Sequence, residues 1–257
     1  MTPIELALAG LAAAGAGAVN ALAGGGTMIS FPALLALGVP PIAANVTNAV
    51  ALCPGYFGAT LAQAKHLQGQ GRRLRWCVPA AIAGGLFGGM ILLRTHERTF
   101  QSLVPYMLMF ASVLLALQER VRAAVLRRLS HVHGTRHSPL AAAIPVGAAA
   151  VYGGFFSAGM SILVLAVVGV TVEDSFTRLN ALKQVLAFSI NVAAAVFFLF
   201  SGQVLWLLAA VMAVGALLGG VVGGKLAGKL SPTAMRWLVV IVGALLAIYY
   251  WMRDMLL

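Results

Sequence analysis

The sequence predicts an all-α polytopic membrane protein built from two inverted halves. Of its 257 residues, 61% are hydrophobic and 9% are charged, whereas a soluble domain carries about 25% charged residues. A soluble core could not bury so much apolar surface, so the composition indicates that lipid is the solvent. The order of apolar segments and glycine breaks in the first half also recurs in the second half.

The first half begins with an apolar span that stops at three consecutive glycines, Gly24, Gly25 and Gly26. The apolar piece that follows, 27–38, is too short to cross alone, since a transmembrane helix needs about 20 residues. The predicted segments are, in order, 4–23, the short piece 27–38, and spans at 43–63, 76–93 and 99–117. We assign residues 1–117 to a first transmembrane repeat.

The second half follows the same plan after a basic segment, 118–138, which we interpret as a cytoplasmic linker. Its break, Gly153 to Gly159, lies between a span and another short apolar piece. The predicted segments are a span at 139–156, the short piece 160–170, and spans at 174–200, 204–224 and 235–252. Residues 139–257 form the second repeat, and the chain has about 8–10 membrane segments when short or re-entrant helices are counted.

Glycines four residues apart provide a further match between the halves. Gly84-Gly-Leu-Phe-Gly-Gly89 and Gly219-Gly-Val-Val-Gly-Gly224 each lie in the third full span of their half. Such glycines let helix backbones approach closely, so we expect these two motifs to pack helices together.

Basic residues indicate the topology. They gather in loop 64–75, linker 118–138 and loop 225–236, whereas the counterparts of the two loops carry less net positive charge. If the basic segments face the cytoplasm, equivalent helices run in opposite directions and both termini are non-cytoplasmic. This requires each broken pair to form a re-entrant hairpin or two crossings; a single crossing would make the halves parallel. The formal charge of +11 is explained by this orientation, and we expect no nucleic-acid partner.

The glycine breaks predict a binding site. Irregular backbone at membrane depth must pack against protein or line a watery cavity, and a short helix beginning at Thr27 would direct its positive end toward an anion. The alternative is a tight turn that needs glycine only for its backbone freedom. Two copies, each followed by amides, favour a site.

Lys183 provides the charge of the predicted site. It lies on one helical stripe with Asn180, Gln184 and Asn191, at a depth where a lysine is costly in lipid. No acidic residue is within obvious helical reach, so we expect an anionic substrate as its partner. Pairing with backbone carbonyls of the broken helix is the alternative.

Amides and hydroxyls of both halves complete the prediction. The candidate substrate-binding residues are Asn20, Gly24, Gly25, Gly26, Thr27, Asn45, Thr47, Asn48, Gly153, Gly154, Ser157, Gly159, Asn180, Lys183, Gln184 and Asn191.

These motifs resemble a known family. The stretches from Asn20 to Pro32 and from Ala44 to Asn48 look like the first-repeat signature of the TauE/SafE (TSUP) family of sulfite and organosulfonate exporters. Tyr152 to Gly159 and Asn180 to Lys183 resemble its second-repeat signature. The resemblance implies a multi-pass bacterial inner-membrane carrier that moves small sulfur-containing anions, usually outward.

We therefore expect a secondary membrane transporter, an exporter of anions such as sulfite or organosulfonates. A passive anion channel and a non-transporting membrane subunit or enzyme are the alternatives. We expect no enzyme activity, cofactor or metal, because no catalytic set or nucleotide-binding loop is found and the histidines at 131, 133 and 137 read as a solvated loop. Glu173 and Asp174 are expected to cap a helix. The sequence leaves open the exact substrate, the direction, a coupling ion and a homodimer.

Overall fold

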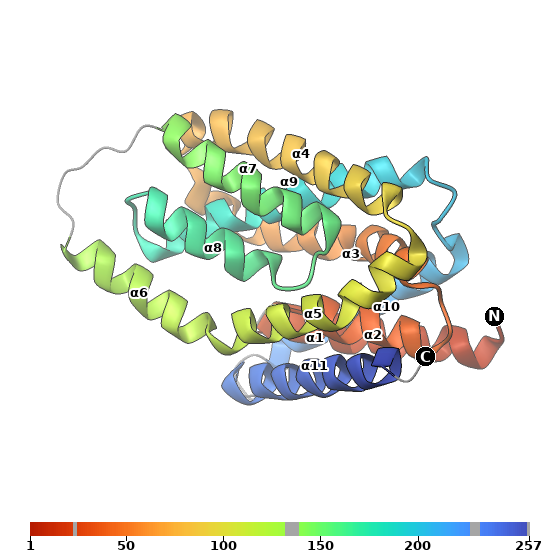
Figure 1. Cartoon of the computed structure of the whole chain (residues 1–257). Helices are drawn as coiled ribbons and strands as arrows, with labels where there is room; N and C mark the ends of the chain where they lie inside the picture. Colours follow the sequence, from red (N-terminus) through yellow and green to blue (C-terminus); the bar gives the residue numbers. More distant parts are fainter. Residues whose placement is uncertain (23–24, 132–138, 227–231, 256–257) are drawn as a thin grey trace.

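The expected all-α class is confirmed. The computed structural model describes residues 1–22, 25–131, 139–226 and 232–255, and within these ranges the chain forms helices and short connections without a strand (Figure 1). The helices are α1 (Pro3–Leu22), α2 (Thr27–Ala36), α3 (Pro41–Ala62), the 3-10 helix η1 (Ala64–Leu67), α4 (Gly71–Arg94), α5 (Glu97–Ala116), α6 (Gln118–His131), α7 (Pro139–Phe155), α8 (Met160–Thr171), α9 (Phe176–Leu199), α10 (Trp206–Leu226) and α11 (Pro232–Met255).

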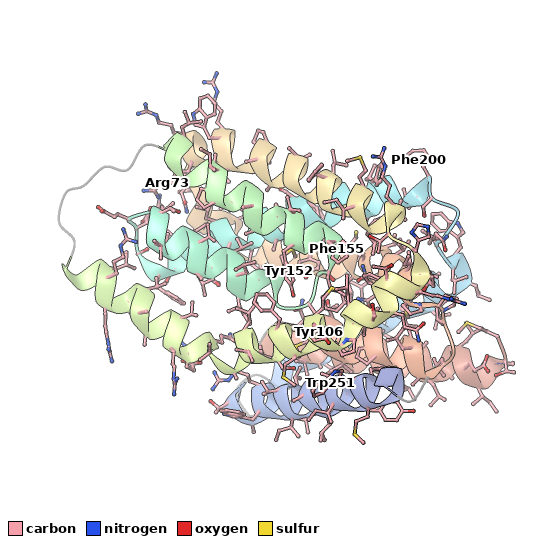
Figure 2. The ribbon with its side chains drawn as sticks, in the orientation of Figure 1. Arg73, Tyr106, Tyr152, Phe155, Phe200 and Trp251 are labelled. Atoms are coloured by element: carbon pink, nitrogen blue, oxygen red, sulfur yellow. The ribbon has the colours of Figure 1, made fainter. Side chains whose placement is uncertain are left out.

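The surface of the bundle suits lipid. Among the described residues, four helices are long and apolar enough to cross a membrane, namely α1, α4, α5 and α9. All four tryptophans are exposed and lie near helix ends, at positions 76, 206, 237 and 251. Tyr106, Phe200 and Trp251 likewise project from the outer surface (Figure 2). Tryptophan and tyrosine near helix ends are typical of membrane–water interfaces.

Glycine contacts join the two halves. α4 packs along α7, and α1 packs along α10. A Cβ on Gly88 would lie 2.1 Å from the carbonyl oxygen of Val151, and one on Gly219 would lie 1.9 Å from that of Ala14. Any side chain at these positions would force the helices apart, so the expected packing role is confirmed for both motifs.

Contacts between helices also give their relative directions. Asn191 lies beside Ala49, while Asn180 lies beside Gln63, so α9 runs antiparallel to α3. Arg236 pairs with Glu119, and Gly243 lies next to residue 112, so α11 runs antiparallel to α5. Sequence order makes α9 the counterpart of α3 and α11 that of α5. These opposed directions are what an inverted repeat requires; the inverted repeat and the division into two repeats remain predictions.

The two ends of the bundle differ. α1 begins and α11 ends at the right of Figure 1, whereas α6 lies at the left, the end where Arg73 is seen in Figure 2. We call this left end, which holds residues 63–73, α6 and the connection 172–175, the basic end. The segment expected as a linker thus contains a helix, α6, which Arg236 of α11 anchors through Glu119 at 2.7 Å.

Candidate functional site

The first break is a tight turn whose backbone packs against α1. Gly25 has a φ of +89°, a conformation that L residues other than glycine rarely adopt. Gly26 packs directly on α1, because a Cβ there would lie 2.2 Å from the carbonyl oxygen of Ala16. Gly24 lies outside the described residues. The turn that the sequence left as an alternative is therefore present, and it lies against a cavity.

The second break differs from the first. Gly159 has a φ of +77° and precedes α8. A Cβ on Gly154 would lie 2.1 Å from the carbonyl oxygen of Gly85, and one on Gly153 would lie 2.4 Å from the sulfur of Met160. These three glycines were expected at the binding site, but they do not line the cavity described next. Close packing explains them.

A cavity of about 560 Å³ opens within the basic half of the bundle. That volume lies inside the range of small-molecule sites, about 300–1,000 Å³. Its lining comes from the C-terminal halves of α3 and α10, the N-terminal halves of α8 and α9, and the first break. The polar side chains that line it are Asn20, Tyr56, Gln63, Gln118, Ser161, Asn180, Lys183 and Gln184.

Lys183 is the only charged side chain among the described residues that line the cavity. The described part of the lining contains no acidic residue. Among the described residues, Lys183 has neither a carboxylate partner nor a hydrogen bond to a backbone carbonyl. The described structure therefore gives no support to the carbonyl-pairing alternative, and the ammonium faces a space with no protein counter-charge.

Tyr56 forms part of the cavity wall and links the two short helices. Its hydroxyl lies next to the side chains of Thr27 and Ser161, which are the first residue of α2 and the second of α8. The positive ends of both helix dipoles thus converge at this hydroxyl. Thr27 is buried, and the hydroxyl of Ser157 in the second break donates to Thr27 Oγ1 at 3.5 Å.

Five of the predicted residues line the cavity, namely Asn20, Gly26, Asn180, Lys183 and Gln184. Sequence reasoning missed Tyr56, Gln63, Gln118 and Ser161. Tyr56 could have been found, because it continues the face of α3 that carries Asn48, eight residues and about two turns along the helix. Gln63 and Gln118 gave no comparable signal, since polar residues at helix ends are ordinary.

Three other predicted polar residues have structural partners away from the cavity. Asn191 Nδ2 donates to the carbonyl oxygen of Ala49 at 3.0 Å. Thr47 Oγ1 accepts from the backbone N–H of Leu205 at 3.1 Å. Asn45 Nδ2 donates to the carbonyl oxygen of Phe155 at 2.9 Å. The structure thus brings these three side chains to helix contacts.

Asn48 is different from these three. It is fully buried, and both its amide oxygen and its amide nitrogen have no partner among the described residues. An unsatisfied buried polar group costs about 1–3 kcal/mol. The side chain of Asn48 therefore adds no hydrogen bond to the stability of the described structure.

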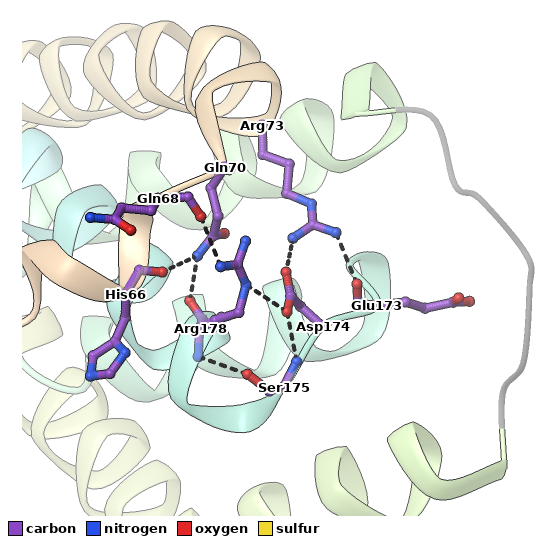
Figure 3. Close-up of polar contacts among 8 residues, drawn as sticks. All are labelled: His66, Gln68, Gln70, Arg73, Glu173, Asp174, Ser175 and Arg178. Carbon is purple, nitrogen blue, oxygen red and sulfur yellow. Dashed lines mark hydrogen bonds and ion pairs between the residues drawn. The ribbon is translucent and has the colours of Figure 1, made fainter.

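A polar network ties the halves together at the basic end (Figure 3). Asp174 accepts from Arg73 and pairs with Arg178 at 2.8 Å, while Arg178 donates to the carbonyl oxygen of Gln68 at 2.8 Å. Burial favours a higher pKa for the Asp174 carboxyl, but the hydrogen bonds from the two arginines outweigh it and lower the pKa. Ser175 caps α9 by accepting from the backbone N–H of Arg178, so the expected cap is one residue further on and Asp174 serves as the ion-pair partner.

The sequence is similar over most of its length to one protein family and to several membrane transporter proteins. The "Sulfite exporter TauE/SafE" family model matches residues 9–250. A "Probable membrane transporter protein" of Haemophilus influenzae is 27% identical over 88% of this chain and 86% of its own length. YfcA of Escherichia coli K12, described in the same words, is 24% identical over 96% and 90%, and ORF9 of Sinorhizobium sp is 28% identical over 91% and 87%. No solved structure matches the chain.

Proposed function

The chain belongs to the sulfite exporter TauE/SafE family, and on this premise we propose that it exports small sulfur-containing anions, such as sulfite or organosulfonates. Its similarity to membrane transporters over most of its length supports a transport role. In this proposal the protein binds and releases the anion without catalysing a reaction. It does so in the bacterial inner membrane.

The observation that carries this proposal is Lys183, which has no carboxylate partner in the described part of the chain and lies in a cavity whose described lining has no acidic side chain. A lysine ammonium has three donors and a compact charge, which suits the oxygens of a sulfite or sulfonate group. A bound anion would also offset the cost of keeping a charge away from bulk water. Gln184 and Asn20 offer amide groups at the same cavity.

The position of the cavity supports outward transport. It opens in the half of the bundle that holds the basic end, and the positive-inside rule places this end in the cytoplasm. An anion from the cytoplasm would reach Lys183 first. The lining residues do not extend into the N-terminal half of α3, so we favour a carrier with one open side over a passive channel.

Transport of radiolabelled sulfite by the purified protein in proteoliposomes tests the proposal. Hydrogen bonds to charged groups contribute about 1.5–3 kcal/mol, so Lys183→Ala should weaken apparent affinity about 10- to 150-fold. Lys65→Ala is the matched control, because Lys65 is an exposed lysine of the same end. Normal sulfite affinity in Lys183→Ala would contradict the anion site.

Counterflow separates a carrier from a channel. Vesicles preloaded with unlabelled sulfite should take up labelled sulfite faster than empty vesicles if the protein is a carrier. A panel of sulfite, thiosulfate, sulfonates, sulfate and carboxylates in a thermal-shift assay then identifies the substrate class. A shift with carboxylates alone would move the substrate outside sulfur anions.

A further inference from the structure

Each break meets the polar motif of the opposite half. Gly26 of the first break and Asn20, near the end of α1, line the cavity with Asn180 and Lys183 of the second half. Phe155 of the second break accepts a hydrogen bond from Asn45 of the first half at 2.9 Å. The molecule therefore contains two arrangements of a break beside a polar helix motif, of which one lines an open cavity.

The second arrangement is buried and incompletely bonded. Asn48 is 0% exposed and Asn45 is 2% exposed. Both side-chain polar atoms of Asn48 and the amide oxygen of Asn45 have no partner among the described residues. Native structures pair most buried polar atoms, so three unpaired ones in consecutive turns of α3 point to a ligand or a second conformation that satisfies them.

The face of α3 connects the two arrangements. Asn45, Asn48, Leu52 and Tyr56 are spaced three or four residues apart, so they lie along one face of the helix. Leu52 and Tyr56 line the open cavity. Asn48 lies one turn beyond Leu52, about 6 Å along the helix axis and away from the basic end. The unpaired amides thus continue the cavity's own wall past Tyr56.

Helix directions place this second arrangement on the other side of the protein. α3 and α9 are antiparallel, so Asn45 to Asn48 and Asn180 to Lys183 lie in opposite halves of the bundle. Between them, the Tyr56 hydroxyl lies next to the side chains of Thr27 and Ser161. Tyr56 and Leu52 therefore separate a polar site that is open from one that is closed.

We propose that Asn48, one turn along α3 from Asn45, forms a second, occluded station for the same oxyanion, which opens away from the basic end when the Lys183 cavity closes. This inference rests on the proposed function. The Asn48 amide N–H group would donate to the anion, while the unpaired amide oxygens of Asn48 and Asn45, which can only accept, would bond to water that enters with it. Because this station is neutral whereas the first carries Lys183, it would hold the anion less tightly and favour its release.

The decisive variant is Asn48→Leu, which replaces the unpaired amide with an apolar side chain of similar size. If Asn48 were only a packing residue, its replacement would reduce transport only by lowering the amount of folded protein, and the unfolding midpoint would fall as well. We expect instead that the thermal unfolding midpoint stays equal or rises, that sulfite still shifts this midpoint, and that transport falls about tenfold or more. Unchanged transport in Asn48→Leu, with Lys183→Ala impaired, would overturn the second station alone.

Cysteine labelling gives a readout that does not depend on transport. Cys53 and Cys77 are the only cysteines, so both can be replaced before Asn48→Cys or Ala59→Cys is introduced. Ala59 lines the open cavity, and its cysteine should react with an impermeant thiosulfonate added at the basic end. The Asn48→Cys protein should react only from the opposite side, at a rate changed by an added organosulfonate, which, unlike sulfite, does not react with the thiosulfonate.

The labelling outcomes are distinct. Reaction of Asn48→Cys from the basic end would make Asn48 a deep part of the open cavity and would overturn the second station. No reaction from either side, with Ala59→Cys reactive, would leave Asn48 permanently buried and would overturn the proposal. Failure of sulfite to bind the parent protein would instead contradict the proposed function. If the protein without Cys53 and Cys77 does not fold, the transport measurement on Asn48→Leu in the natural sequence still tests the proposal.

Discussion

Asn45 of α3 donates from Nδ2 to the carbonyl oxygen of Phe155 at 2.9 Å, so an amide of the first half satisfies the end of a broken helix in the second half. Phe155 is the last residue of α7, and the final carbonyls of a helix lack intrahelical partners. Away from water such a carbonyl must find another donor. This explains why an amide occurs at that depth of α3.

Asn45→Ala should therefore destabilise the protein. The substitution removes the donor to Phe155, and a neutral hydrogen bond contributes about 0.5–1.5 kcal/mol, with a further cost if the carbonyl stays unsatisfied. Thermal unfolding in detergent should show a lower midpoint than for the parent protein. An unchanged midpoint would mean that water or lipid headgroups reach the end of α7.

Gly26→Ala should be strongly disruptive, whereas Gly15→Ala should be tolerated. A Cβ on Gly26 would lie 2.2 Å from the carbonyl oxygen of Ala16, but one on Gly15 meets nothing within 4 Å. Overpacking costs about 1–3 kcal/mol, while alanine is favoured over glycine in a helix by about 1 kcal/mol. Comparison of the two unfolding midpoints checks this, and equal values would show that the first break can move away from α1.

The position of the breaks and of Lys183 could be predicted from sequence because glycines and charges inside apolar spans are costly and therefore visible. The hydrogen-bond partners of the buried asparagine side chains could not be predicted in this way. Asn191 is bonded to Ala49, 142 residues away, while Asn48 has no partner among the described residues, and the mainly apolar sequence that follows both gives no sign of this difference. The same holds for α6, whose polar sequence reads as a linker but whose packing involves Arg236 of α11.

Asp174→Asn should lower stability at neutral pH and have a smaller effect in acid. The pKa of the folded Asp174 carboxyl lies below its ordinary value, because bonds from Arg178 and Arg73 outweigh its burial. Its stabilisation is therefore complete above the unfolded pKa and is lost as the pH falls through the folded pKa. Unfolding midpoints measured from neutral to acidic pH should converge for the parent and variant proteins. A constant difference would show that the Asp174 charge is not involved.

Asn191→Leu should behave in the opposite way to Asn48→Leu. Asn191 is buried, donates to Ala49 and contacts the sulfur of Cys53 at 3.2 Å, so its amide joins α9 to α3. Leucine would remove that bond from a tightly packed contact, at a cost of about 1–3 kcal/mol, and the unfolding midpoint should fall. Sulfite affinity of the protein that remains folded should be unchanged, because Asn191 does not line the cavity. Lost affinity with an unchanged midpoint would instead return Asn191 to the binding site, where its position on the Lys183 stripe first suggested it.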